Sequence, residues 1–243
     1  MRAIPLLITL ICLSWSAHAT PPSVYWPLDK GTFWIYEGDV SWVEANAQTG
    51  QNEIRQKHLT WRSEVTDCID VNGVTVALVH GSPLDLAWYN SKKQPSDTLL
   101  IGVGPDYYRV TKNAVATFAH IKAAGDYLPT ADPNAPGETA EILINGPLAP
   151  GKKFGIDGDS LYGLFRDRCC EMVDGPVPFD LRPVRGAPRI VHAQVYSITC
   201  QTSPDNDEID FAPGLGITAY TYNHHGTTMK VEVALKEFGV AKN

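Results

Sequence analysis

Stretches in which apolar and polar residues alternate recur along the chain, and this period of two constrains the fold more than any other feature. Successive side chains of an extended strand point to opposite faces, so the alternation indicates strands with one buried face. Residues 33–43 alternate aromatic and polar side chains, residues 54–71 form a long stretch of mixed polarity, and residues 74–80 are a β-branched run. Strand character also appears at residues 99–103, 107–111, 161–169, 190–200, 217–222 and 228–238. About nine or ten such strands predict a mostly β protein, with an antiparallel curved sheet that forms an open barrel or a sandwich.

Turn signals separate these stretches. Asn72-Gly73 tolerates positive φ at both positions, as a tight hairpin turn requires, so we expect a hairpin over residues 65–80. A second hairpin is expected around Gly104-Pro105. Residues 175–188 are rich in proline, which cannot donate to a strand ladder, and should be irregular. Only residues 113–122 have a helical composition, so at most one or two short helices are expected.

The N-terminus has the pattern of an export signal. Arg2 precedes an apolar run over residues 4–13, and Ala17-His18-Ala19 matches the small-x-small site of signal peptidase. The run is shorter than the roughly 20 residues that span a bilayer, and no later stretch approaches that length. We therefore expect a signal peptide at residues 1–19, a single β-rich domain at residues 20–243, no transmembrane span, and a periplasmic or secreted location.

The net charge bears on the kind of partner, and the cysteines bear on disulfide formation. The net charge is −7, which disfavours binding to phosphate backbones, so no nucleic-acid partner is expected. Four cysteines follow the signal and are disulfide candidates in an oxidising compartment: Cys68, Cys169, Cys170 and Cys200. They allow three pairings. A bridge between adjacent cysteines strains its own peptide unit, so we expect one of the adjacent pair to bond to Cys200 or Cys68.

Every tryptophan after the signal lies before residue 90. Trp34, Tyr36 and Trp42 keep even spacing and therefore share one face of a strand. Such a face is either part of the core or a concave aromatic wall that holds an apolar ligand. On the second interpretation these three residues, together with Trp61, are candidate ligand-binding residues.

A short motif around Ser160 suggests one catalytic alternative. Gly158-Asp159-Ser160-Leu161 has the tetrapeptide of a class of secreted esterases and lipases. In that class the serine follows the first strand of an α/β fold, and a D-x-x-H near the C-terminus supplies the base. Here no alternation of strands and helices is present, and His192, His224 and His225 lack the aspartate three residues before them. A secreted serine hydrolase that uses Ser160 is therefore the alternative function.

Four carboxylates crowd into six residues, at Asp205, Asp207, Glu208 and Asp210. The default interpretation is a solvated acidic loop. Calcium could neutralise such a cluster, although the glycine of an EF-hand loop is missing. Arg182, Arg185 and Arg189 could neutralise it instead. No other metal or cofactor is expected.

His224 and His225 adjoin at a predicted hairpin tip over residues 223–226. Adjacent side chains of a strand point in opposite directions, so the pair should not bind one metal together. A role in the turn, before Gly226, and a contact with a ligand both remain open.

Three stretches together resemble a group of secreted bacterial proteins without an established activity. Tyr25-Trp26-Pro27-Leu28, followed by Gly31, Trp34 and Tyr36, matches the opening Y-x-P-L-x-x-G-x-x-W-x-Y. Residues 147–152 are similar to a mid-chain P-L-x-P-G-x, and residues 212–217 to the A-P-G-V-G-[LI] before the last hairpin, with Leu215 in place of valine. The resemblance implies a β-rich envelope protein with a curved sheet or half-barrel, like those of lipoprotein carriers, and it supplies no catalytic residue to carry across.

The sequence thus predicts a non-catalytic periplasmic or secreted protein. Its curved sheet would bind an apolar small molecule, a lipid or an envelope protein on an aromatic-rich face. The predicted absence of catalysis depends on the lack of any complete catalytic constellation along the chain.

Overall fold

The structure is a computed structural model of the whole chain, and it describes residues 25–126, 140–154, 171–181, 191–201, 205–225 and 229–240. The predicted signal peptide, Ser160, Cys169 and Cys170 lie outside the described residues, as do the three arginines at 182, 185 and 189. No helix among the described residues is long and apolar enough to cross a membrane.

The described residues form one antiparallel sheet of twelve strands, in the order β6-β5-β4-β3-β2-β1-β12-β11-β10-β9-β8-β7. Neighbouring strands are therefore consecutive in the chain except at the centre, where β1 pairs with β12. The strands are β1 Phe33–Ala45, β2 Asn52–Val71, β3 Val74–His80, β4 Asp97–Val103, β5 Asp106–Val110, β6 Glu141–Ile144, β7 Lys153–Phe154, β8 Glu171–Leu181, β9 Val191–Gln201, β10 Asp205–Ala212, β11 Gly216–His224 and β12 Lys230–Gly239. The mostly β prediction is confirmed.

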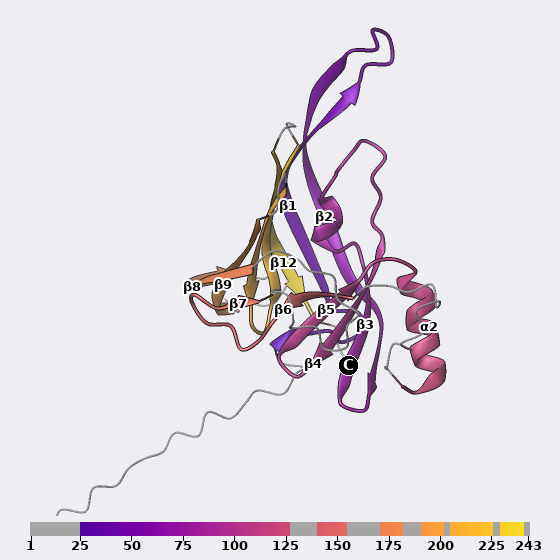
Figure 1. Cartoon of the computed structure of the whole chain (residues 1–243), viewed down its shortest axis with the longest axis vertical. Coiled ribbons are helices and arrows are strands. Elements are labelled where there is room, and N and C mark those ends of the chain that lie inside the picture. Colours follow the sequence, from indigo (N-terminus) through magenta and orange to yellow (C-terminus); the bar gives the residue numbers. More distant parts are fainter. Residues whose placement is uncertain are drawn as a thin grey trace, which may run out of the picture.

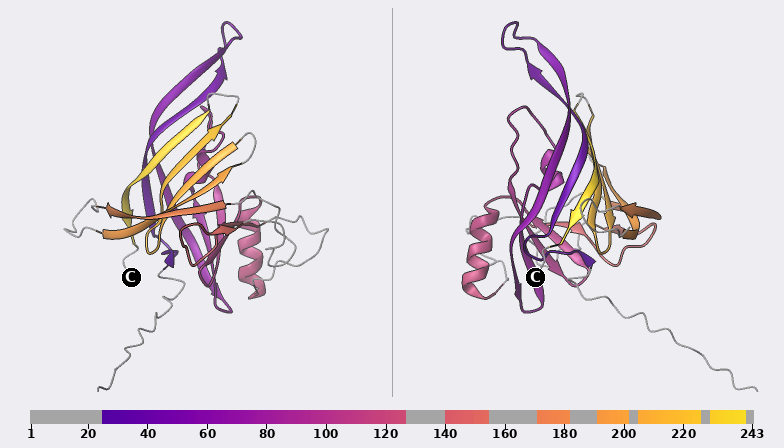
Figure 2. Two further views of the ribbon diagram at one scale, coloured as in Figure 1. Left: turned by 60° about the vertical axis from the view of Figure 1, so that its left-hand side comes forward. Right: turned by 180° about the vertical axis from the view of Figure 1, so that it is seen from behind.

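The sheet curls into a half-barrel whose concave face holds the main core (Figures 1 and 2). On the opposite face of β3, β4 and β5 lies a second apolar cluster, which the helix α2, Ala114–Ala124, covers with Phe118 and Ile121. The β1–β2 hairpin is longer than its neighbours and projects beyond them, as Figure 1 shows. A short 3-10 helix, η1 Pro83–Leu86, is the other described helix.

Both predicted hairpins in the first half are confirmed. Val71 pairs with Val74, and Asn72 and Gly73 have φ of 52° and 82°, as the primed two-residue turns require. Val103 pairs with Asp106 around the second turn. The strand β1 also contains Gly38, which packs directly on the backbone of β12. A Cβ atom there would lie 2.0 Å from the Glu232 carbonyl oxygen, so glycine permits the central β1–β12 pairing.

Part of the proline-rich segment departs from its prediction. Residues 175–181 belong to β8 and pair with β9, whereas we expected irregular chain. The register shifts between Asp174 and Val177, and Gly175 takes a φ of 101° at this irregularity. Among the described strands, β8 pairs on its other side with β7 through residues 171 and 172, so its prolines lie where no described neighbour needs their N–H for a ladder bond.

Candidate functional site

The aromatic residues singled out in the sequence lie on the concave face and are buried. Trp34 and Tyr36 are each 2% exposed, Trp42 is 6% exposed and Trp61 is 7% exposed. All four belong to the main core. The face that even spacing predicted for Trp34, Tyr36 and Trp42 therefore packs as core in the described structure, and it leaves no open aromatic wall at these three positions.

Two of these side chains use their polar atoms within the fold. The Trp34 indole Nε1 donates to the Leu215 carbonyl oxygen at 2.6 Å, and the Tyr36 hydroxyl donates to the Ile217 carbonyl oxygen at 2.9 Å. Burial raises the pKa of the Tyr36 phenol, which keeps it a neutral donor. These contacts reach from β1 across β12 to the start of β11 and hold the centre of the half-barrel together.

Two of the stretches that carry the family resemblance meet at this place. The Gly214 N–H donates to the Tyr25 carbonyl oxygen at 2.7 Å. The Trp26 indole lies so close to Gly216 that a Cβ atom there would be 2.4 Å from its nitrogen. Burial raises the pKa of the Tyr25 phenol to about 12. These contacts therefore join the segment before β1 to the turn between β10 and β11.

The strand β2 has an open edge. Its residues 64–71 pair with β3, but residues 52–63 pair only with β1 among the described strands. The chain leaves the sheet after His80, so no strand among the described residues occupies the position beside the upper half of β2 that β3 would fill. We call the side of residues 52–63 that faces away from β1 the open edge.

The direction of the backbone groups along the open edge follows from the ladder. Val65 exchanges hydrogen bonds with residues 31 and 32, and so points toward β1. The Arg62 carbonyl faces Gly81, on the opposite side. Because backbone groups alternate sides along an antiparallel strand, the N–H and C=O groups of Gln56, His58 and Thr60 point out of the open edge.

A segment over residues 81–96, which we call the wall segment, rises beside this edge. At its base the Gly81 N–H donates to the Ser96 carbonyl oxygen at 2.8 Å, and the Trp61 indole donates to the Gly81 carbonyl oxygen at 2.9 Å. Higher up, the ring of Tyr89 contacts that of Trp42 with centroids 5.0 Å apart. Near its tip Ser91 donates to Glu44 of β1 and lowers the pKa of that carboxyl. The wall segment is thus fixed at three heights against the β1–β2 hairpin.

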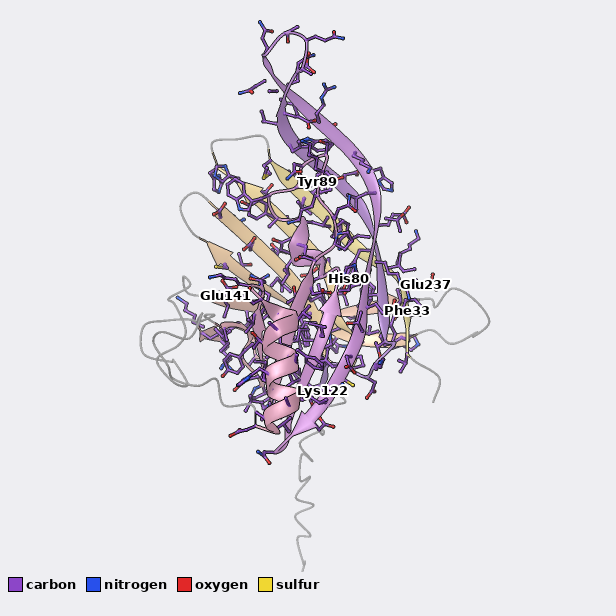
Figure 3. All side chains as sticks on the ribbon, turned by 90° about the vertical axis from the view of Figure 1, so that its right-hand side faces the viewer. Phe33, His80, Tyr89, Lys122, Glu141 and Glu237 are labelled. Atoms are coloured by element: carbon purple, nitrogen blue, oxygen red, sulfur yellow. The ribbon has the colours of Figure 1, made fainter. Side chains whose placement is uncertain are left out.

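A groove of about 500 Å³ lies between the open edge and the wall segment. Its lining comes from β2, from the end of β3 and from the wall segment: Lys57, Leu59, Thr60, Trp61, Arg62, Glu64, Thr66, His80, Tyr89, Lys93, Gln94 and Pro95. The apolar contributors are Leu59, Trp61, Tyr89 and Pro95. In Figure 3, Tyr89 lies above His80 along the hairpin, so the two mark the upper and lower parts of the groove.

The groove is lined by more basic than acidic side chains, although the chain as a whole has a net charge of −7. Within it Arg62 forms an ion pair with Glu64 at 2.9 Å, and the His80 Nδ1 lies 2.9 Å from Asp97 Oδ1. Lys57 and Lys93 have no ion-pair partner within the described residues. An occupant with a carboxylate near these two ammonium groups would therefore supply a missing counter-charge.

On the convex side of the open edge, His58 already interacts with two carboxylates of β1. The His58 Nδ1 lies 2.9 Å from Asp39 Oδ1, and its Nε2 lies 3.3 Å from Glu37 Oε1. The hydrogen bond with Asp39, followed by that with Glu37, raises the pKa of His58. The hydrogen bonds of Glu37 to His58 and to Lys236 lower the pKa of that carboxyl.

The two histidines of the β11–β12 connection lie at the rim of the half-barrel. His224 ends β11, and its ring contacts that of Trp88, from the wall segment, with centroids 4.6 Å apart. Trp88 is 49% exposed, has a φ of 58° and also contacts Tyr222. His225 is exposed in the turn. The hairpin prediction is confirmed, since Asn223 pairs with Lys230, and a ligand contact of these histidines stays a prediction.

The four clustered carboxylates lie on the strand β10 and not in a loop, which corrects the default interpretation. Two of them face β11: Asp205 accepts a hydrogen bond from the Tyr222 hydroxyl at 2.6 Å, and Asp207 accepts one from the Tyr220 hydroxyl at 3.1 Å. Glu208 and Asp210 alternate onto the other face. Burial, then the charge of Asp210, raises the pKa of Glu208. The strand separates the four into two pairs, and the described residues contain no group of three or more His, Cys, Asp or Glu that could hold a metal ion.

The cysteines that the structure describes differ in state. Cys200, at the end of β9, is disulfide-bonded, and its partner lies outside the described residues. Cys68 is a free thiol of intermediate exposure. The predicted pairing with Cys169 or Cys170 cannot be followed further, because both positions lie outside the described residues. Ser160 lies outside them too, and the hydrolase alternative stays a prediction.

Of the groove residues, Trp61 alone was singled out in the sequence as a candidate ligand-binding residue. The others were missed, yet one signal was present. The predicted strand 54–71 is much longer than its hairpin partner 74–80. A strand that outruns its partner leaves backbone groups unpaired unless a third strand covers them. The positions of Lys57 and Lys93 beside that edge depend on the path of the wall segment, and no local pattern indicates it.

No known family profile matches the chain, and no curated protein matches it. Among solved structures it is similar to a predicted exported protein from Bacteroides fragilis with a YMCC-like fold, at 9% identity and a TM-score of 0.42, over 89% of this chain and 99% of the other. It is also similar to a predicted lipoprotein from Parabacteroides distasonis, at 9% identity and a TM-score of 0.39, over 89% and 98% of the two chains.

Proposed function

We propose that this chain is a non-catalytic exported protein of the bacterial envelope that binds an extended segment of a partner protein along the open edge of β2. The export signal supports the location. The single observation that carries the binding role is the stretch of β2, residues 52–63, that pairs on one side only. Strand addition to such an edge supplies main-chain hydrogen bonds for affinity and side-chain contacts for specificity.

The open edge is a better template for an added strand than the two outer edges of the sheet. The last strands, β6 and β7, have four and two residues, which are too short to act as templates. The part of β8 that extends past β7 contains Pro176 and Pro178, and proline on an edge opposes the addition of a strand. The open edge is much longer and lies within the sheet, above the point where β3 departs. It is also flanked by a groove, so an incoming strand would contact the wall segment as well as β2.

Charge makes a second copy of the same edge an unfavourable occupant. Arg55, Lys57 and Arg62 line this part of β2, and pairing two such edges would bring like charges together. Lysine and arginine on an edge strand protect against self-association in this way. The edge is therefore suited to a different protein with acidic residues.

The concave aromatic face is less suited to an apolar small molecule or a lipid. The aromatic residues expected to bind such a ligand are buried, and two of them, Trp34 and Tyr36, donate their hydrogen bonds to backbone carbonyl oxygens. The apolar part of the groove, at Leu59, Trp61 and Tyr89, is the surface where such a molecule would compete with a strand. No observation among the described residues favours the serine hydrolase.

The proposal is tested by site-specific photo-crosslinking in the cells that export the protein. A benzoylphenylalanine at Gln94, in the groove, should form an adduct with a partner protein, and one at Glu232, on the exposed side of β12, should not. Thr60→Pro should abolish the Gln94 adduct, because it removes an N–H that points out of the open edge while leaving the β1 ladder intact.

The decisive result is the loss of the Gln94 adduct in the Thr60→Pro variant. An adduct with a protein does not by itself support strand addition. An adduct from Gln94 that persists in the proline variant would contradict strand addition. Absence of any protein adduct, together with copurified lipid, would favour a small-molecule ligand in the groove and overturn the proposal.

A further inference from the structure

The groove has a side-chain pattern that specifies the partner segment, and this inference rests on the proposed function. We infer that the segment runs antiparallel to β2 and reads, from its N-terminus, apolar-x-apolar-x-acidic. The two apolar residues face Trp61 and Leu59, and the carboxylate faces Lys57 and Lys93.

The direction follows from the position that the segment would fill. The strand β3 occupies the same side of β2 lower down and is antiparallel to it, with His80 opposite Glu64. Every other described ladder of the sheet is also antiparallel. A segment that continues the line of β3 therefore keeps the hydrogen-bond geometry and twist that the sheet already has.

The apolar positions follow from the inward face of β2. Leu59 and Trp61 point to the concave side, are 7% exposed each, and form the groove with Tyr89 and Pro95. In an antiparallel pair, residues directly opposite each other place their side chains on the same face. The residues opposite Trp61 and Leu59 would therefore enter the apolar part of the groove, two positions apart in the segment.

The acidic position follows from the next inward residue, Lys57. Since an antiparallel segment advances as β2 runs backward, the residue opposite Lys57 comes two positions after the one opposite Leu59. Lys93 of the wall segment lines the same groove, and neither lysine has an ion-pair partner within the described residues. A carboxylate at this position would meet two ammonium groups.

The intervening positions carry little specificity. They would lie opposite Thr60 and His58 on the convex face. Thr60 is exposed, and the His58 ring already has Asp39 and Glu37 as partners. Small polar residues at these positions satisfy the pattern, so the recognition information lies in the three inward residues.

Fluorescence anisotropy with labelled nine-residue peptides tests the pattern on the purified mature protein. The first peptide has the central sequence Val-Thr-Val-Thr-Glu, the second has the reversed order Glu-Thr-Val-Thr-Val, and the third has Lys in place of Glu. All three share the same polar flanks. The first peptide should bind most tightly. The lysine peptide should bind about three- to tenfold more weakly, because its lysine would repel Lys57 and Lys93, which the glutamate would attract.

Charge reversal in the protein provides the matched control. Lys57→Glu should invert the preference between the glutamate and lysine peptides, whereas Lys112→Glu, at an exposed lysine that does not line the groove, should leave it unchanged. Tighter binding of the reversed peptide would overturn the direction, and tighter binding of the lysine peptide would overturn the acidic position.

Two further outcomes separate this inference from the proposed function. Equal binding of all three peptides that Thr60→Pro abolishes would overturn the side-chain pattern and leave strand addition standing. Failure of every peptide to bind, while the Gln94 adduct still depends on residue 60, would overturn the pattern alone. Failure of both experiments would overturn both.

Discussion

The strand β2 contributes to two regions with opposite character, the concave aromatic face and the open edge. At Trp61 the side chain is buried and its indole nitrogen is bonded to Gly81. One residue earlier, Thr60 is exposed and its backbone groups point toward no strand. The comparison shows that Trp61 is fixed in the core while the main chain one residue away has no described strand beside it. On the proposed function, a partner would therefore bind through the unpaired main chain.

The difference has a physical origin in the lengths of the strands. A curved sheet buries one face of every strand, so large rings on that face pack against one another and exclude ligands. Edge groups are buried only where a neighbouring strand is present. The strand β3 ends at His80, opposite Glu64, whereas β2 extends past this point as far as Asn52. In this part of β2 the inward side chains are packed, but the backbone groups on the side away from β1 have no described strand to pair with.

The largest expected effect comes from the aromatic face. Trp34→Ala should lower the free energy of unfolding by about 3–5 kcal/mol, since it leaves a cavity and an unbonded Leu215 carbonyl. Thr60→Ala, at the open edge, should change it by less than about 0.5 kcal/mol. Urea denaturation followed by circular dichroism measures both values. Similar losses for the two variants would remove the distinction between the regions.

Proline substitutions at adjacent positions give a smaller and more specific contrast. The Leu59 N–H points to β1, opposite Gly38, so Leu59→Pro should cost about 1–3 kcal/mol beyond Leu59→Ala. Thr60→Pro should cost less than this, because its N–H leaves the sheet. The same denaturation experiment compares the three variants. If Thr60→Pro destabilises as much as Leu59→Pro, a hydrogen bond exists at the open edge and the edge is not available.

The smallest effect concerns the histidine on the convex side of the edge. The pKa of His58 is raised in the folded state, first by its hydrogen bond with Asp39. Its stabilising contribution is therefore complete below the unfolded pKa of about 6.5 and is lost as the pH rises through the folded pKa. NMR titration should show that Asp39→Asn lowers the His58 midpoint. An unchanged midpoint would mean that Asp39 does not hold the ring.

Much of the fold could be predicted from local patterns. Alternation located most strands, and Asn72-Gly73 fixed one hairpin to the residue, because turn geometry and strand periodicity depend on near neighbours. The acidic segment was predicted as a loop because its partners, Tyr220 and Tyr222, are on another strand. The proline-rich part of β8 was missed because its edge position is set by the short strand β7.

The candidate site was less accessible to sequence reasoning than the fold. Trp34, Tyr36 and Trp42 were correctly placed on one face, but whether a shared face is core or ligand surface depends on what packs over it. The groove needs the departure of β3 and the return of the wall segment to bring Lys57 and Lys93 together. The length mismatch between β2 and β3 was the one signal that pointed to the open edge.

The most direct test is amide hydrogen exchange measured by NMR, residue by residue along β2. In the free protein the amides of Gln56, His58 and Thr60 should exchange fast, while those of Lys57, Leu59 and Trp61 are protected by β1. Addition of the Val-Thr-Val-Thr-Glu peptide should slow exchange at the first three. If these amides are already protected in the free protein, or remain fast when the peptide is bound, the open edge does not accept a strand.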